Sequence, residues 1–483
     1  MLRVPAVVAT ALVVFVGCTG NGSSLPGIES PASDPRTPDT AAEARRAVTV
    51  ERIREHLEAL AAIATENGGN RAAGTAGYDG SVEYVARRLE EAGYDVTLQR
   101  FSAPVFEQLR PSVLEVHGGR RFVDGKDFKA MIYSAAGDVT APLATASFDP
   151  DGTGREGLGC DGLSLPPGSV ALLRPGPCFF RDQVVNAVKT GARAVIFAVP
   201  EYSRHGGVLR PTLITPDGID VPVVAATDAA GRALYAAGEG AEIHVATEVS
   251  SGREEVANVI ADSNGGDGDI VMMGGHLDSV IDGPGINDNG SGVATILEVA
   301  EEFAGAAFER PTRFAFWAGE ELGLLGSRHY ISTLDDEVDD IAVYLNFDML
   351  ASSNHVHYVY ADQGPEAGEA ITAAFEAALD RAGEPHETID LEGRSDHGPF
   401  LQARVPVGGL FSGADDRKTE RQERLFGGTA GAQADPCYHR ACDDLDNVDE
   451  TSLEVMGGRD SRRRLPAGIG LNPDRPEACR AAR

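Results

Sequence analysis

Several residue types are scarce in this chain of 483 residues, and their scarcity excludes some classes of function. It has one Trp and an aromatic content of 6%, which argues against an aromatic-lined carbohydrate-binding surface. Basic residues are few: 42 Lys and Arg stand against 74 Asp and Glu, so that the formal net charge is −32 at pH 7. A surface this negative repels nucleic acid and anionic lipid. The composition therefore favours a soluble protein, or one that binds cations.

Long apolar runs are also lacking, apart from one at the N-terminus. The run Val4–Gly17 is shorter than the roughly 20 residues that a membrane-spanning helix needs, so residues 1–18 are predicted to be a signal peptide. The stretch Phe15–Cys18 resembles a bacterial lipobox, in which Cys18 would be lipidated, and an ordinary cleavage site is the alternative. We therefore expect an exported chain, lipid-anchored at the outer face of the bacterial cell membrane or else secreted.

Residues 19–48 have almost no apolar content and are rich in Ser, Pro, Asp, Thr and Gly. Such a segment cannot bury enough surface to fold, so we expect a disordered tether. Disulfides are permitted in an exported chain. Cys437 and Cys442 are close enough in sequence to staple one small loop, and Cys160 could pair with Cys178, which leaves Cys18 for the lipid and Cys479 unpaired.

The pattern of apolar residues divides the remaining chain into two units. Helical spacing predicts helices over 50–65 and 81–92. Between 111 and 250, short β-like runs are separated by Gly and Pro turns around one expected helix at roughly 181–190. We interpret 111–250 as a separate β-rich domain inserted into a domain formed by 49–110 and 251–458.

From residue 252 onward, apolar strands alternate with helices expected at 291–305, 321–332 and 366–382. This alternation predicts an α/β fold with a mixed, mostly parallel sheet that is covered by helices on both faces. In such sheets, ligands bind beyond the carboxyl ends of the strands. The residues at those ends are therefore the candidates for chemistry.

Acidic and histidine side chains follow these strands in order. One strand ends with His276 and Asp278, whose spacing of two places both side chains on one side of an extended backbone. Asp278 could restrain the His276 ring. Asp288 lies in a Gly- and Asn-rich loop before a helix that Asn289 or Ser291 can cap.

The remaining candidates complete the set. Glu320 and Glu321 are neighbours at a strand-to-helix turn, where their side chains diverge and suit two different tasks, metal binding and proton transfer. Asp348 ends an otherwise apolar strand, and Tyr438 and His439 lie between two cysteines. His nitrogen and carboxylate oxygen both suit zinc, and shared carboxylates suit a two-metal site, so the sequence predicts a metal hydrolase.

Other histidines are given different roles. We expect His355 and His357, which alternate on one strand, to be structural or exposed, and His397 to support the ligands rather than bind metal. The string GPGIN lacks a phosphate-loop or dinucleotide pattern, so nucleotide binding is not expected.

Seven ordered strings carry a resemblance to a known family: GGHLDSV, GPGINDNGSGVA, FWAGEELGLLGS, NFDML, GRSDHGPF, GGLFSGA and DPCYHRACD. On them the chain resembles the co-catalytic two-zinc aminopeptidases of the bacterial leucyl aminopeptidase and aminopeptidase S type, which implies a three-layer zinc-exopeptidase fold. The insertion resembles the protease-associated (PA) domain, most clearly at CFFRDQVVNAVKTGARAVIF.

The resemblance implies roles for individual residues. His276 and Asp348 would hold one zinc and Glu321 and His439 the other, with Asp288 as the bridge. Glu320 would be the general base, Asp278 the acid behind His276, and Tyr438 a donor to the transition state. The substrate pocket would be lined by Met349, Gly393, Arg394 and Phe411. The calcium site of some relatives is possible but cannot be mapped onto this sequence.

The function expected from this resemblance is removal of one N-terminal residue, preferably apolar, from peptides with a free N-terminus. The inserted domain is expected to affect which substrate sizes are accepted. Alternatives are a carboxypeptidase or glutaminyl cyclase-like enzyme on the same scaffold, or a non-catalytic PA-domain binding protein. No nucleic-acid partner is expected, and the oligomeric state is not predicted. Residues 459–483 depart from the family, because they form a basic tail that resembles a frameshifted end.

Overall fold

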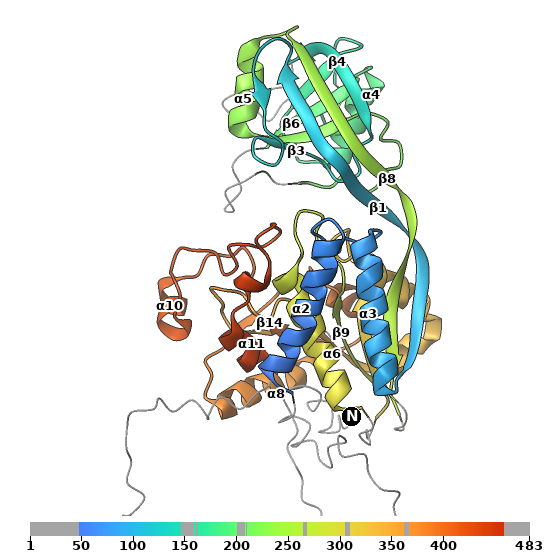
Figure 1. The fold of residues 1–483 in the computed structure, drawn as a ribbon, viewed down its shortest axis with the longest axis vertical. Coiled ribbons are helices and arrows are strands. Elements are labelled where there is room, and N and C mark those ends of the chain that lie inside the picture. Colours follow the sequence, from blue (N-terminus) through green and yellow to red (C-terminus); the bar gives the residue numbers. More distant parts are fainter. Residues whose placement is uncertain are drawn as a thin grey trace, which may run out of the picture.

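The chain folds into two units joined by a long two-stranded ribbon (Figure 1). The computed structural model describes residues 48–457 apart from 146–158, 161–162, 200–207, 209, 264–267, 305–309 and 362–366. The expected signal peptide with Cys18, nearly all of the tether, and the basic tail lie outside the described residues. Among the helices that are described, none is both long and apolar enough to cross a membrane.

The larger unit is a mixed sheet between helices, as the sequence predicted. Its strand order is β13-β12-β14-β11-β9-β10-β8, with β1 beside β8. The four central strands β14, β11, β9 and β10 are parallel, so their carboxyl ends meet at one edge. The strands are β1 (Asp95–Val116), β8 (Glu242–Asp262), β9 (Ile270–His276), β10 (Thr312–Trp317), β11 (Ile341–Phe347), β12 (Tyr358–Tyr360), β13 (Glu387–Ile389) and β14 (Val407–Phe411).

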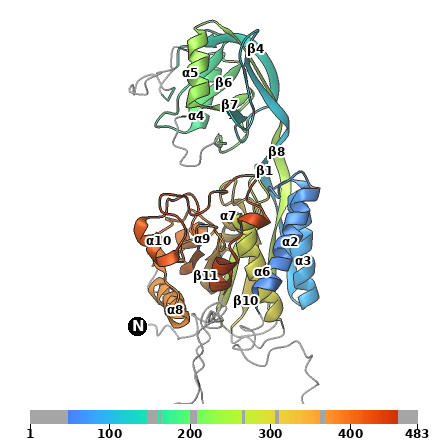
Figure 2. The ribbon, with the colours of Figure 1, turned by 60° about the vertical axis from the view of Figure 1, so that its left-hand side comes forward.

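Helices cover both faces of this sheet (Figure 2). In strand β10, successive side chains alternate between the two faces of the sheet. Phe314 and Phe316 pack into the core under α2, α3, α6 and α8, while Trp317 packs on the opposite face against α7 and α9. The helices and helical turns are α2 (Val50–Glu66), α3 (Ala76–Ala92), η2 (Ile286–Ser291), α6 (Gly292–Glu302), α7 (Leu325–Ser332), η3 (Asp335–Asp340), α8 (Ala367–Ala382), α9 (His397–Gln402), α10 (Glu420–Phe426), η4 (Leu445–Asn447) and α11 (Glu450–Met456).

The first two helices are delimited by local signals. The Thr49 hydroxyl accepts a hydrogen bond from the backbone N–H of Arg52, and Thr75 accepts one from Tyr78, so both helices have side-chain N-caps. Helix α3 ends at Gly93, whose φ of 95° suits glycine. Val48, at the end of the expected tether, is buried in the core beneath these helices.

The smaller unit is the inserted domain at the top of Figure 1. Strands β4, β5, β6 and β7 are parallel neighbours, with β3 antiparallel at the edge. One helix was expected here, but the structure has two, because Thr227 caps a second helix that begins at Asp228. The elements are β2 (Arg121–Phe122), β3 (Phe128–Ala130), β4 (Gly137–Ala144), β5 (Val170–Leu173), α4 (Phe180–Lys189), β6 (Ala194–Val199), β7 (Val223–Thr227) and α5 (Asp228–Ala237).

Strands β1 and β8 run without a break through both units. They pair as antiparallel neighbours from Asp95 opposite Asp262 to Val116 opposite Ile243, with register shifts near Arg110. The predicted domain boundaries at 110/111 and 250/251 fall inside these strands. The ribbon therefore fixes where the inserted domain emerges, and further contacts fix how it lies over the larger unit.

Two kinds of contact hold the inserted domain against the larger unit. Asp282, in the loop after β9, accepts hydrogen bonds from Lys129 at 2.9 Å and from Arg210 at 2.9 and 3.0 Å. These charged side chains are at most 20% exposed. Leu322 packs against the hydrophobic cores of both units. We call the Asp282–Lys129–Arg210 group the interdomain clamp.

The clamp generates a stability prediction. Asp282→Ala removes the acceptor shared by two shielded cations, and such a loss typically costs about 2–3 kcal/mol. We expect faster amide hydrogen exchange at 129–132 than in the wild-type protein. The control is Glu248→Ala, which removes an exposed partner of Arg110 and should have little effect. Equal exchange rates in the two variants would contradict a holding role for Asp282.

The same clamp should withstand acid. Burial alone would raise the pKa of Asp282, but Arg210 and Lys129 outweigh it and lower this pKa below its usual value. The stabilisation is therefore complete above the ordinary aspartate pKa of roughly 3.9 and is lost only as pH falls through the lower folded value.

Candidate metal centre

Five predicted ligands from distant parts of the chain meet at the carboxyl edge of the parallel strands. His276 ends β9, and Trp317, which precedes Glu320 and Glu321, pairs with it at the end of the neighbouring strand β10. Asp348 directly follows β11. Asp288 lies in the turn η2, and His439 lies in the loop closed by Cys437 and Cys442. The parallel register therefore brings these side chains to one place.

The ligands form two groups that share one carboxylate. In the first group, His276 Nε2 lies 3.3 Å from both Asp288 Oδ1 and Asp348 Oδ1. In the second, His439 Nε2 lies 3.2 Å from both Asp288 Oδ2 and Glu321 Oε2. Within each group the candidate ligand atoms lie within 4.8 Å of one another. Asp288 thus turns one oxygen toward each group.

The unsatisfied oxygens of this cluster fit a bound cation. Asp288 Oδ2, Glu321 Oε1 and Asp348 Oδ1 are buried and accept no hydrogen bond. Buried carboxylate oxygens without hydrogen bonds are costly unless a cation pairs with them. Two imidazoles and three carboxylates are a donor set that suits zinc. The residues present therefore fit divalent metal, one ion for each group.

The surplus negative charge also acts on the pKa values. Burial alone would lower the pKa of His276 and of His439, but neighbouring carboxylates outweigh it and raise both well above the ordinary histidine value. Burial would raise the pKa of Asp288, yet the two histidines hold it well below its usual range. The site is thus one in which positive charge is strongly favoured.

Asp278 holds the turn that carries the two glutamates. Its carboxylate accepts hydrogen bonds from the backbone N–H of Glu320 at 3.1 Å and of Glu321 at 3.4 Å. The His276 ring is restrained by the Asp278 backbone carbonyl, 3.0 Å from Nδ1, while the carboxylate oxygen is 3.7 Å away. The expectation was that the carboxylate restrains the ring, but its oxygen lies beyond hydrogen-bond distance of Nδ1, and the backbone carbonyl takes that place.

Glu320 lies beside the first group. An oxygen of its carboxylate, one of Glu321 and a nitrogen of His276 lie within 4.8 Å of one another. Burial and the charge of Glu321 raise the pKa of Glu320 well above its usual value, although His276 opposes the shift. Glu320 is therefore placed next to the ligands and has a raised proton affinity.

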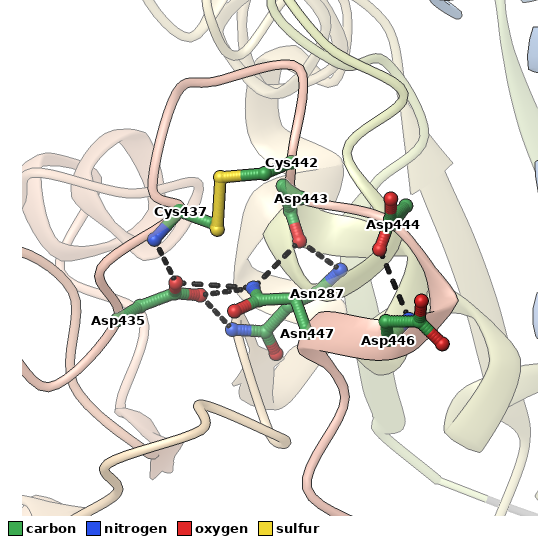
Figure 3. Close-up of a disulfide and its surroundings, with 8 residues drawn as sticks. All are labelled: Asn287, Asp435, Cys437, Cys442, Asp443, Asp444, Asp446 and Asn447. Atoms are coloured by element: carbon green, nitrogen blue, oxygen red, sulfur yellow. Dashed lines mark hydrogen bonds between the residues drawn. A yellow bond between two sulfur atoms is a disulfide. The ribbon is translucent and has the colours of Figure 1, made fainter.

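A buried polar layer beneath Asp288 was not identified from the sequence. The Asp443 carboxylate accepts a hydrogen bond from the backbone N–H of Asn287 at 2.9 Å (Figure 3). It accepts another from the backbone N–H of Asp288 at 3.0 Å. Asp435 accepts from the side chains of Asn287 and Asn447. Burial and the neighbouring acids raise the pKa of Asp443 to about 8. The one feature of the sequence that could have pointed to this layer is Asp443, the acidic residue that directly follows Cys442.

Asn289, rather than Ser291, caps helix α6. Its Oδ1 accepts hydrogen bonds from the backbone N–H of Gly292 and of Met349, both at 3.0 Å. Its Nδ2 donates to the carbonyl of Phe347. A Cβ at Gly275 would lie 2.9 Å from this amide nitrogen, so glycine permits the close approach. Asn289 therefore connects the Asp288 turn to the start of the Asp348 loop.

Two further residues fix the ligand loops. The fully buried Arg71 donates to the backbone carbonyls of Leu277, Pro284 and Gly285, which fixes the loop between His276 and Asp288. The Ser395 hydroxyl donates to Asp348 Oδ2 at 2.6 Å. Neither was predicted, because a lone Arg or Ser carries no motif.

The Cys437–Cys442 disulfide closes a short loop around Tyr438 and His439. His439 has a φ of 59°, a conformation that is costly for a residue with a side chain. The ring of Tyr438 stacks on that of His439 with centroids 3.8 Å apart. The structure also pairs Cys160 with Cys178. The small loop therefore fixes both side chains next to the cluster.

The predicted pocket residues lie beside Tyr438. Met349 and Phe411 are buried in one apolar cluster with Tyr360 and Leu391, and Tyr438 packs against it. Arg394 Nε donates to the carbonyl of Leu391, and Gly393 has a φ of 72° with the Cα of Gly398 close by. Met349 and Phe411 thus belong to an apolar cluster that contacts Tyr438, and the pocket roles of Gly393 and Arg394 stay predictions.

The other histidines lie apart from the ligand groups. His355 and His357 stack on each other with centroids 4.8 Å apart and are mostly shielded from solvent. His397 is buried against Tyr360, and neither of its ring nitrogens has a hydrogen-bond partner. It therefore does not hold a ligand by hydrogen bonding.

A cavity of ≈ 890 Å³ opens on the other side of Tyr438, between the two units. The larger unit contributes the loop after β9, Glu321, Leu322 and the segment Tyr438–Ala441. The inserted domain contributes mostly apolar residues together with Lys129 and Arg210. The inserted domain therefore forms one wall of the space next to the metal ligands.

The polar layer leads to a prediction about metal affinity. Asp443→Ala leaves the N–H groups of Asn287 and Asp288 without their acceptor, so Asp288 should lose its fixed position. Removal of such a supporting group typically lowers metal affinity about 10- to 100-fold, and zinc competition with a chelator would measure it. The control is the neighbouring Asp444→Ala, which removes only a local hydrogen bond to Asp446. Unchanged zinc affinity in Asp443→Ala would contradict this role.

Comparison with known proteins agrees with the geometry. Residues 258–459 match Peptidase family M28, and residues 139–234 match the PA domain. The chain is 38% identical, over 94% of its length and 92% of the relative's, to a probable lipoprotein aminopeptidase, LpqL, of Mycobacterium tuberculosis. It is 37% identical to an aminopeptidase of Pseudomonas aeruginosa, over 85% of this chain and 79% of that one.

A solved structure is similar over most of its length. It is BSAP, a zinc aminopeptidase from Bacillus subtilis, with a TM-score of 0.65 and 25% identity over 85% of this chain and 92% of that one. The resemblance found in the sequence is thereby confirmed: this chain belongs to peptidase family M28 and carries an inserted PA domain.

Proposed function

We propose that this protein is an exported, zinc-dependent aminopeptidase that hydrolyses the N-terminal peptide bond of peptides, with a preference for apolar N-terminal residues. Its class follows from its family and relatives: it is a metallo-aminopeptidase. The metal count, the roles of the residues, the side-chain preference and the location are the parts that we propose.

One observation carries the proposed two-zinc site. Asp288 turns one carboxylate oxygen to His276 and the other to His439, and each histidine has a further carboxylate beside it. In this proposal His276 and Asp348 hold one zinc, Glu321 and His439 hold the other, and Asp288 bridges them. When bound, the metal would polarise the scissile carbonyl and lower the pKa of a water to about 7.

The chain's own residues would then move the proton. Glu320 lies next to the ligands, and its backbone is held by Asp278, so its carboxylate can take a proton from the attacking water and later deliver it to the leaving nitrogen. The Tyr438 hydroxyl would donate a hydrogen bond to the oxygen on which negative charge develops. Burial, with nearby carboxylates, raises the pKa of Tyr438 well above its usual value, so it keeps its proton.

The apolar cluster beside Tyr438 supports the proposed preference. Met349 and Phe411 contribute apolar surface there, which would favour burial of an apolar side chain. Gly393 and Arg394 would line the same pocket. The free amine would lie near the carboxylates of Glu320 and Asp348, whose charge suits an ammonium group.

The proposed location rests on the N-terminal sequence and one relative. The stretch Phe15–Cys18 resembles a lipobox, and the Mycobacterium tuberculosis relative is named a probable lipoprotein. We therefore propose export with a lipid anchor at Cys18.

The general-base role predicts a separation of metal binding from turnover. Glu320→Ala should retain zinc, because the two ligand groups stay intact, while kcat falls by about 10²–10⁴-fold through loss of the proton acceptor. Metal analysis and hydrolysis of leucine p-nitroanilide measure the two properties. The exposed Glu91→Ala serves as the control. A Glu320→Ala variant with a near-wild-type rate would remove Glu320 from the mechanism.

The reaction predicts a strict need for a free α-amine. Leucyl substrates should be hydrolysed at least about 100-fold faster than their N-acetyl forms, because the acetyl group removes the ammonium charge that Glu320 and Asp348 would meet. A preference for the acetylated form would instead favour a carboxypeptidase, and release of cyclised N-terminal glutamine a glutaminyl cyclase. A pure protein without zinc would support the binding-protein alternative.

A further inference from the structure

The cavity between the two units lies on the side of the metal ligands where the leaving part of a substrate would be held. Tyr438 contacts both sides: it packs against the apolar cluster of Met349 and Phe411, and it lines the cavity together with Glu321 and His439. If the N-terminal side chain lies in the apolar cluster, the rest of the peptide must extend past the ligands into the cavity. In that pose, the residues that line the cavity would contact the leaving portion of the substrate.

The lining of this cavity contains three basic residues beside the acidic Asp282 and Glu321, in a protein whose net charge is −32. Lys129, Arg210 and Arg440 all line it. The first two are engaged by Asp282 in the interdomain clamp, and Arg210 also donates to Gln108 and to the carbonyl of Ala130. Their donor groups are therefore engaged, although the single carboxylate of Asp282 offsets only one of the two charges.

Arg440 differs from these two. Its Nη2 is shielded from solvent and has no hydrogen-bond partner, and no carboxylate among the described residues forms an ion pair with it. Its backbone is fixed, because its N–H donates to Cys437 and its carbonyl accepts from Asp443. A Cβ at Gly283 would lie 2.1 Å from that carbonyl, so the segment is packed tightly. One shielded nitrogen of a guanidinium thus has no hydrogen-bond partner directly after His439.

A shielded guanidinium N–H without an acceptor is costly, and its preferred partner is a carboxylate. We propose that Arg440 binds a carboxylate on the leaving portion of the substrate, which in a di- or tripeptide is the C-terminal carboxylate. The inference rests on the proposed function, since it names the substrate class of that same site. A residue spans at most about 3.6 Å, so only a short peptide brings its terminus to a side chain adjacent to the ligands.

The experiment compares substrates that differ only in one carboxylate. Leu-Ala against Leu-Ala-amide tests the terminal carboxylate, and Leu-Asp-amide against Leu-Asn-amide tests an acidic side chain as the source. All four share the free amine and the apolar N-terminal residue. For the wild-type holoenzyme we expect kcat/KM to be about 10- to 100-fold higher for the acid of the preferred pair.

Variants of Arg440 test whether this residue causes the preference for the acid over the amide. In Arg440→Gln the acid-to-amide ratio should fall close to one. Arg440→Lys keeps the charge but loses the planar fork, so its ratio should be intermediate, and it serves as the second variant if the first does not fold. The control is Arg121→Gln, an exposed arginine of the inserted domain, which should retain the wild-type ratio.

Each outcome decides the inference. A ratio that depends on Arg440 in either substrate pair supports carboxylate binding and identifies its source. A wild-type ratio near one in both pairs, or a ratio unchanged in Arg440→Gln and Arg440→Lys, overturns it. Hydrolysis of leucine p-nitroanilide, which has no carboxylate, reports the proposed function separately: activity there with no acid preference refutes only the role of Arg440.

Discussion

The close approach of carboxylates around Asp288 is the constraint on which the rest of the site depends. Three acids and two histidines are forced together at one sheet edge, and buried oxygens among them accept no hydrogen bond. Like charges at this range repel strongly in a poorly hydrated site, so the arrangement is stable only with compensating positive charge. Asp443, Asn289 and Arg71 hold the surrounding backbone by buried hydrogen bonds, which keeps the ligands in place against that repulsion.

Residues of both units line the cavity next to the candidate metal ligands. The loop after β9 leaves the ligand His276 and reaches the inserted domain at Asp282, and Leu322, next to Glu321, packs against both cores. Displacement of the inserted domain would therefore act on segments that carry ligands. In the proposed function, the apolar cluster and the cavity, both of which Tyr438 contacts, would offer different chemistry to the two ends of a short peptide.

The sequence predicted what depends on local pattern. Alternating strands and helices indicated the mixed sheet, which the structure confirms, and polar residues directly after apolar strands, such as His276 and Asp348, indicated the ligand candidates that the fold brings together. The supporting residues could not be predicted, because Asp443 and Ser395 act through single tertiary hydrogen bonds that leave no periodic signal. Helix α5 was missed because its short Ala-rich sequence lies among strands. The interdomain clamp could not be predicted, because Lys129 and Asp282 are 153 positions apart in the sequence.

The antiparallel pairing of β1 with β8 has a consequence for how the second unit is connected to the first. Neighbouring antiparallel strands can be joined by a turn of about two residues, so the whole segment from Val116 to Glu242 stands where a simple reverse turn would suffice. The ribbon alone therefore does not require the inserted domain, whereas the contacts of Asp282 and Leu322 do depend on it. The two strands of the ribbon are also far apart in sequence. The pairing of β1 with β8 can therefore be completed only after more than half of the protein has been synthesised.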